Sequence, residues 1–263
     1  MVKFKGFHPS FLKGGTVMNR NEAYPMSDVR SLQLHAGWAS VELLSGDVPE
    51  LQLIVSGTDA DVDDLKVTAA EGRISIEQPT YGLNPRLNTA RWMQIIVRVP
   101  AFWKGEIVAC TTTGQLNARG LSGSDVRLET VSGPIRAENL ESITLMLQTV
   151  SGAVRGELLY SEQASVHTVS GDAELNDCAF RRASVNTVSG DVLMALNAPL
   201  EALSGNSVAG AIRLYAPMSA ADVVLKSATG RLRTSGISLT EGAPSIRVTS
   251  VSGALELNNN QTA

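Results

Sequence analysis

Few side chains in this chain of 263 residues have the types and spacing that catalysis requires. The three histidines, His8, His35 and His167, lie far apart in the sequence, and none stands at a spacing typical of metal ligands. Serine recurs immediately before a glycine at Ser132, Ser151, Ser170 and Ser189. None of these serines has the Gly-x-Ser-x-Gly context or the adjacent histidine base of a nucleophile. No phosphate-binding loop or dinucleotide fingerprint is present. We therefore expect no catalytic residue, no bound metal and no cofactor.

Acidic residues provide the only candidates for an acid–base pair. Asp172 and Asp191 stand at equivalent positions of two repeated segments, with Glu174 close by. Glycan-cleaving enzymes use two carboxylates at a separation that the mechanism sets. This keeps open a carbohydrate-active enzyme, either a polysaccharide lyase or a hydrolase. The four aspartates of residues 59–64 lack the ordered spacing and terminal glutamate of a calcium loop, so we expect a solvated turn there.

Arginines form the most suggestive polar pattern. They recur at one position of the repeated segments, as Arg136, Arg155, Arg213 and Arg233. If the segments stack as strands, neighbouring arginines would lie ~4.8 Å apart on an outward face. We expect like-charge stacks of Arg136 over Arg155 and of Arg213 over Arg233. Two interpretations stay open: a solvated face of mixed charge, or a strip that binds an anionic glycan or cell-envelope polymer.

A short phrase that recurs eight times must position these residues. Its four clearest copies read Thr-Val-Ser-Gly, beginning with residues 130–133. The glycines of the eight copies are Gly114, Gly133, Gly152, Gly171, Gly190, Gly210, Gly230 and Gly253. Successive glycines are 19, 19, 19, 19, 20, 20 and 23 residues apart. A nearly fixed period of this length is typical of a solenoid, in which each repeat buries its apolar side against its neighbours.

Each repeat contains two alternating segments. Apolar residues lie seven and five positions before each glycine and two and four after it, with polar residues between them. Alternation with period two predicts a half-buried strand on each side of the phrase. The alternation changes phase inside the phrase, from the valine two before the glycine onward, so this valine is expected to face inward. The phrase should then form a corner, where glycine accepts a positive φ and lets stacked backbones approach closely.

Two strands and two turns in 19–20 residues, without a helical period, predict an all-β fold. Its architecture would be a single-stranded, right-handed parallel β-helix. Coils stacked in chain order at ~4.8 Å would give a rod of roughly 35–40 Å. Cys110 and Cys178 would lie three coils apart, ~14 Å along the rod, which is beyond the reach of a disulfide.

The period divides the chain into four segments. Residues 1–27 are expected to form an irregular arm or cap, and residues 258–263 a polar tail. Residues 107–257 form the regular array. Residues 28–106 would hold early coils of the same solenoid, since Leu65–Ile76 fits the template around Gly72. Whether residues 28–100 continue the rod or fold separately stays open.

Composition limits the partners and the compartment. The 22 basic and 26 acidic residues give a net charge of −4, which argues against a broad nucleic-acid surface. No apolar run approaches the ~20 residues needed to span a bilayer. The first 15 residues contain three lysines but no apolar stretch typical of a secretory signal, so a cytoplasmic location is expected.

The repeated phrase followed by an alternating strand resembles the bacterial putative-adhesin family of β-strand-repeat domains of unknown function. The resemblance covers roughly Val29 to Asn258 and is strongest over residues 107–257. The strand that ends in Arg98-Val99-Pro100 is also similar to that family. The resemblance implies a β-helical domain, often associated with the bacterial surface or membrane, without established catalytic residues.

Three functions follow from these observations. The first is a non-catalytic β-helical scaffold or adhesin-like binding domain, whose partner would be an anionic glycan or a protein. The second is a self-assembling structural module that forms homo-oligomers through its coil ends, because bare strand edges can pair with another chain. The third is the carbohydrate-active enzyme.

Overall fold

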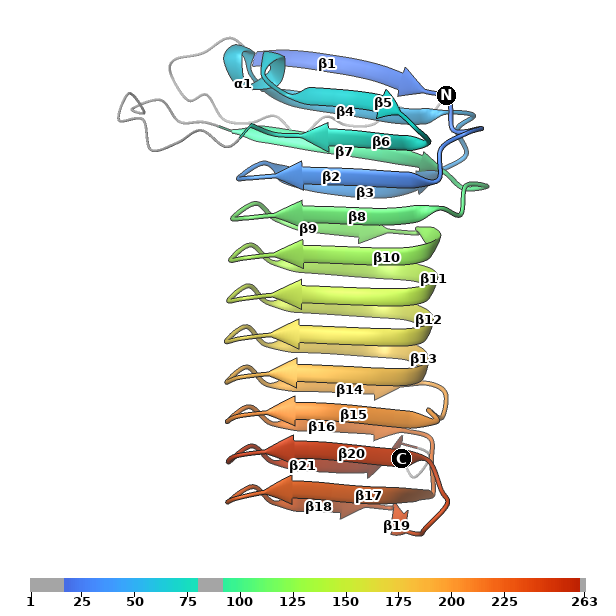
Figure 1. Ribbon diagram of the computed structural model, residues 1–263, viewed down its shortest axis with the longest axis vertical. Helices are drawn as coiled ribbons and strands as arrows, with labels where there is room; N and C mark the ends of the chain where they lie inside the picture. Colours follow the sequence, from blue (N-terminus) through green and yellow to red (C-terminus); the bar gives the residue numbers. More distant parts are fainter. Residues whose placement is uncertain (1–16, 80–91, 261–263) are drawn as a thin grey trace, which may run out of the picture.

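The computed structural model describes residues 17–79 and 92–260, which hold twenty-one strands and one short helix. Figure 1 shows these elements stacked as a tall rod, with β1 at one end and β17, β18 and β19 at the other. The strands lie in two rows, one behind the other, and most coils contribute one strand to each row. The chain is therefore an all-β solenoid.

The front row holds the strands that lead into the Thr-Val-Ser-Gly corner. These are β2 (Ser31–Ala36), β8 (Glu106–Thr111), β10 (Ser122–Thr130), β15 (Ala202–Ser207), β17 (Ala220–Ser227), β20 (Ser245–Ser250) and the second halves of β11 (Ile135–Thr149), β12 (Val154–Thr168) and β13 (Ala173–Thr187). The back row holds β3 (Ser40–Gly46), β9 (Leu116–Arg119), β14 (Val192–Leu196), β16 (Ile212–Ala216), β18 (Leu232–Ser235), β21 (Leu255–Asn259) and the first halves of the same three long strands. Neighbouring strands within these rows pair in parallel, residue above equivalent residue.

Inward columns of apolar side chains fill the space between the two rows. Leu128, Leu147 and Val166 occupy one such column on successive coils, and all three are buried. Alternate residues of each strand face solvent, as the burial of β12 illustrates. The core is thus a narrow apolar file, which fits a chain that is only 5% aromatic.

The corner phrase differs from the prediction in the side chain that it buries. Its valines are exposed, not buried: Val150, for example, exposes 42% of its surface, whereas Thr149 exposes only 2%. The buried threonine hydroxyl donates a hydrogen bond to the glycine carbonyl three residues on, as from Thr187 to Gly190 (2.6 Å). This bond closes the turn inside the core and leaves the next side chain, the valine, pointing outward.

The corner glycines lie in a file and are required by close approach alone. A Cβ on Gly133 or Gly152 would collide with the carbonyl oxygen of the glycine one coil before it. None of the corner glycines has the positive φ that the sequence suggested. Positive φ occurs instead at the opposite turn of the coil, six residues after the corner glycine, at Gly120, Asn139, Leu158 and Asp177.

The coils do not stack in chain order at the end formed by β17 and β18. Strand β20 pairs with β15 on one side and with β17 on the other, and β21 lies between β16 and β18. The file of glycines accordingly runs Gly210, Gly253, Gly230. The expectation of sequential stacking is wrong here, because the connection of residues 236–244 returns the chain by one level (Figure 1).

Residues before the array form one coil and a closing layer. Strands β2 and β3 pair in parallel with β8 and β9, and on their other side with β6 (Arg73–Glu77) and β7 (Met93–Pro100). The proposed coil around Gly72 is wrong, because β5 (Lys66–Ala70) and β6 form an antiparallel hairpin. The tight turn at Glu71 and Gly72, both with positive φ, reverses the chain.

The end of the rod nearest β1 is closed. Strand β4 (Leu51–Thr58) pairs antiparallel with β1 (Val17–Tyr24) and with β7. Helix α1 (Asp59–Asp63) replaces the solvated turn expected at the four aspartates. Leu53 and Val55 of β4 and Val62 of α1 are fully buried within this layer. The described part of the expected irregular arm holds strand β1, and Asn258 and Asn259 of the expected tail lie in β21 (Leu255–Asn259). Residues 1–16 of the arm and 261–263 of the tail lie outside the described residues.

Candidate functional site

Two arginines of the predicted strip lie side by side on the back row. Arg136 of β11 and Arg155 of β12 are register neighbours on adjacent coils. Both side chains face solvent, and among the described residues neither makes an ion pair or a side-chain hydrogen bond. The structure thus brings these two predicted site residues together without an ion pair to a described residue, and Glu174 follows Arg155 in register on the next coil.

The other two arginines are separated by a glutamate. Because the last coil is inserted, Glu256 lies in register between Arg213 and Arg233. It contacts Arg213 at 3.3 Å and Arg233 at 3.0 Å. The predicted like-charge stack of Arg213 over Arg233 is therefore wrong, and an Arg–Glu–Arg ladder replaces it. A hydrogen bond to Asp191 and the charges of Asp191 and Glu256 raise the pKa of Arg213.

An open groove of about 410 Å³ runs beside the free arginines. Its polar lining is Arg136, Arg155, Glu138, Glu157, Glu174 and Asn176, and Ala137 and Gly156 complete it. Glu138 is engaged by Arg119 at 2.7 Å, and Glu174 accepts a hydrogen bond from Asn176 at 3.1 Å. The groove therefore presents planar guanidinium, carboxylate and amide groups, which together can donate and accept hydrogen bonds.

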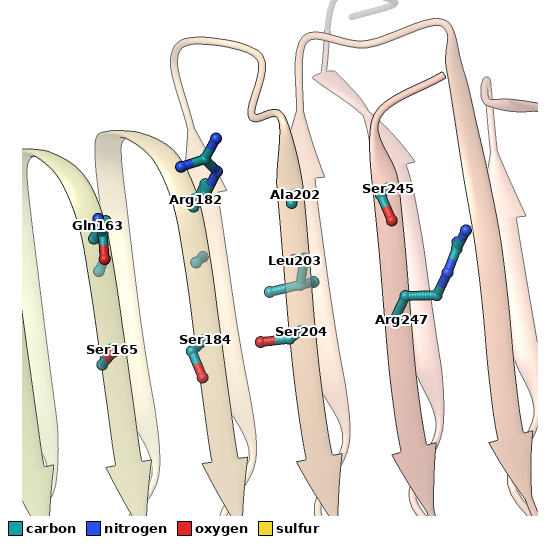
Figure 2. A pocket seen from close by; sticks show the side chains of 11 residues that line it. Gln163, Ser165, Arg182, Ser184, Ala202, Leu203, Ser204, Ser245 and Arg247 are labelled. Carbon is teal, nitrogen blue, oxygen red and sulfur yellow. The ribbon is translucent and has the colours of Figure 1, made fainter. Parts of the chain in front are cut away.

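Figure 2 shows a second groove, on the front row, with serines along its floor. Ser165, Ser184 and Ser204 lie in register on three adjacent coils. The groove encloses about 250 Å³, and its two arginines are both neutralised. Arg182 contacts Glu201 at 3.3 Å, and Arg247 contacts Asp222 at 2.8 Å. Hydrogen bonding to Arg247 lowers the pKa of Asp222. This groove offers hydroxyl groups but no free charge of its own.

The exposed corner valines line a third groove, which the sequence did not indicate. It encloses about 290 Å³ between Val150, Val169 and Val188 on one side and a polar row on the other. The polar row includes His167 and Asn186, whose side chains lie 3.5 Å apart. The valine that recurs in the phrase could have indicated this groove, but the alternating pattern assigned that valine to the inward face.

The geometry supports neither a reactive cysteine nor an acid–base pair of aspartates. Cys110 and Cys178 are both free thiols. Burial, together with the charge of Glu129, raises the pKa of Cys110 to about 12, so its thiol stays protonated near neutral pH. Asp172 and Asp191 accept backbone hydrogen bonds from the next coil, at 2.9 and 2.8 Å. Their carboxylates hold the stack together, and within the described residues no group of three or more His, Cys, Asp or Glu side chains converges as a metal site would require.

Comparison with known proteins extends over most of the chain. The model of the Toastrack DUF4097 family matches residues 29–221. A solved putative lipid binding protein from Parabacteroides distasonis has 15% identity and a TM-score of 0.60, over 93% of this chain and 97% of its own. A putative adhesin from the same organism has 11% identity and a TM-score of 0.59, over 92% and 97%. A putative adhesin from Bacteroides fragilis has 13% identity and a TM-score of 0.54, over 94% and 98%.

The likenesses to solved structures establish the fold and no more, because their sequence identities to this chain are low. No curated protein matches the chain. In the part of the chain that the structure describes, no helix is long and apolar enough to cross a membrane.

Proposed function

The chain belongs to the Toastrack family of domains of unknown function, and we propose that it is a non-catalytic, rod-shaped binding domain that uses Arg136 and Arg155 to hold a hydroxyl-rich, anionic glycan. The right-handed winding expected from the sequence is part of this proposal. So is the division of the chain into an early β region, residues 28–106, and a regular array, residues 107–257. The names of the similar solved structures, adhesins and a lipid-binding protein, favour a binding role at the cell envelope over the cytoplasmic location expected from the sequence.

One observation carries the proposal. Two guanidinium groups that form no ion pair with a described residue lie on adjacent coils, in a groove that also supplies carboxylate and amide groups. Guanidinium groups bind carboxylates and sulfates through paired hydrogen bonds, and the neighbouring Glu157 and Asn176 can accept from or donate to sugar hydroxyls. A linear polymer lying along the rod would meet equivalent positions every ~4.8 Å.

The test compares matched arginine pairs. Affinity electrophoresis of the protein in gels containing polygalacturonate, alginate or dextran should show retardation by the two polyuronides and none by neutral dextran. Arg136→Ala with Arg155→Ala should weaken polyuronide binding by tenfold or more. The control, Arg213→Ala with Arg233→Ala, removes the same number of charges from the same column and should change binding less than twofold. Equal losses in both variants, or unchanged binding in the first, would contradict the proposal.

A further inference from the structure

The end of the rod opposite β1 is open. Its last coil is β17 and β18, whose inward residues Val223, Leu225 and Leu232 are only partly buried. The residues at the same positions one coil inward, Ile246, Val248 and Leu255, are buried. Apolar side chains that a further strand would cover are thus only partly buried at this end, as Met18 and Tyr24 of β1 are at the other.

The outer edge of β17 also has free backbone groups. The N–H of Asp222 donates to Pro244, on the side of β20, at 2.9 Å. Because alternate residues of a strand bond to opposite neighbours, Val223 and Leu225 direct their N–H and C=O groups to the outer edge. The only described strand on that edge is β19 (Ser238–Leu239), and it pairs with Ala220 and Ala221 (Figure 1). Residues 223–227 therefore present an unpaired edge within the described chain.

Two positive charges lie at the corner end of this edge. Lys226 at the end of β17 and Arg231 after the corner are exposed, and neither forms an ion pair with a described residue. Arg233 follows on β18, where Glu256 already neutralises it. A lysine on an edge strand disfavours pairing with an identical edge and favours an acidic partner strand.

A second rod does not fit this end. Strand β19 and the buried Ile237 occupy the level at which the terminal coil of another copy would have to lie. A single extended segment needs only the length of residues 223–227. The occupant is therefore limited to one strand.

We propose that this end of the rod accepts an extended acidic segment of a partner protein as an added strand beside residues 223–227 of β17. The backbone groups of Val223 and Leu225 would supply the hydrogen bonds of the new pair, and alternate apolar side chains of the segment would cover Val223, Leu225 and Leu232. Acidic side chains on its other face would meet Lys226 and Arg231. The arginine groove lies several coils away, so this site is independent of the proposed function.

A labelled heptapeptide that alternates glutamate and valine tests the proposal by fluorescence anisotropy with the full chain. The peptide should bind, and Lys226→Glu with Arg231→Glu should weaken binding at least tenfold. The control, Lys66→Glu with Arg73→Glu, makes the same charge change at the hairpin of β5 and β6 and should leave binding within twofold. Methylation of every backbone amide nitrogen of the peptide should abolish binding, because it removes the N–H groups that pair with the edge in either strand direction while retaining every side-chain charge.

Three results would overturn the inference. The first is binding that survives amide methylation, which would indicate charge attraction alone. The second is equal weakening by both pairs of substitutions. The third is sedimentation velocity showing a dimer of the free protein that Lys226→Glu disrupts, because the occupant would then be a second copy.

Discussion

Leu158 adopts a backbone conformation that disfavours its own side chain. Its φ is 55°, at the position where neighbouring coils place Gly120, Asn139 and Asp177. Glycine, asparagine and aspartate tolerate this left-handed region, whereas other residues lose about 1 kcal/mol or more there. Leu158 is also partly exposed, so its side chain contributes little burial.

We therefore expect Leu158→Asn to raise the free energy of unfolding by about 1 kcal/mol. Chemical denaturation with the slope held common to both proteins would measure the change. The reciprocal substitution, Asn139→Leu, should lower stability by a similar amount. A destabilised Leu158→Asn variant would show that the leucine contributes packing that outweighs its backbone strain.

Cys110 links stability to alkaline pH. Its folded pKa is raised to about 12 by burial and by Glu129, above the ~8.5 of a free thiol. The contribution of the neutral thiol is therefore fully present below the unfolded pKa and is lost as pH rises toward the folded value.

The stability difference between the parent protein and Cys110→Ala should consequently shrink as pH rises from 8 to 11, as urea unfolding at successive pH values would show. Alkylation of Cys110 by iodoacetamide at pH 8 should also be slow compared with that of a free thiol. A difference in stability that stays constant with pH would contradict the raised pKa.

Gln78 completes the corner of the coil formed by β2 and β3. Its side-chain oxygen accepts hydrogen bonds from the N–H groups of Gly37, Trp38 and Ala39, at 2.8, 3.1 and 3.1 Å. Elsewhere in the array, corner N–H groups such as that of Ser151 donate to a carbonyl one coil before them. Gln78 thus replaces the carbonyl groups of a preceding corner.

Gln78→Ala should cost about 1–3 kcal/mol of stability, because it leaves buried N–H groups without an acceptor. Thermal or urea unfolding would measure the loss. Gln148→Ala is a suitable control, since Gln148 lies on the outward row and its side chain makes no hydrogen bond with a described residue. Equal effects of the two substitutions would show that the capping bonds contribute nothing.

The strands could largely be predicted from the sequence, but which side chains of the corner phrase are buried could not. Period-two alternation placed Leu128, Leu147 and Val166 inside correctly, because burial of an apolar side chain dominates the choice of strand face. In the phrase, hydrophobicity alone favoured burying valine over threonine. The threonine hydroxyl reverses this choice, since its hydrogen bond to the glycine carbonyl closes the turn, and a pattern of polarity does not contain that bond.

At the scale of the whole molecule, the order in which the coils stack could not be predicted, because the repeats resemble one another. The segments around Gly230 and Gly253 both match the template, so either could follow the coil of Gly210 without a change in pattern. The same similarity between repeats made the column of arginines predictable from the sequence, but it did not give the order of the last members of that column. Arg136 and Arg155 stack as expected, whereas Glu256 separates Arg213 from Arg233.

Paired cysteines on a background of Cys110→Ala and Cys178→Ala would test this order. Asn206 and Thr249 are register neighbours, whereas Asn206 and Lys226 are separated by the inserted coil. Asn206→Cys with Thr249→Cys should be joined efficiently by a short bifunctional thiol reagent. Asn206→Cys with Lys226→Cys should not, and the reverse result would restore stacking in chain order.

The insertion of β20 and β21 also constrains how the chain is made. Strands β17 and β18 leave the ribosome before the residues that separate them from β15 and β16 in the finished rod. During that interval the edge of β15 and β16 is vacant, and β17 and β18 carry a pattern that fits it. The nascent protein must therefore either delay the docking of its 220–235 segment or release it again, and synthesis of residues 245–259 decides which arrangement persists.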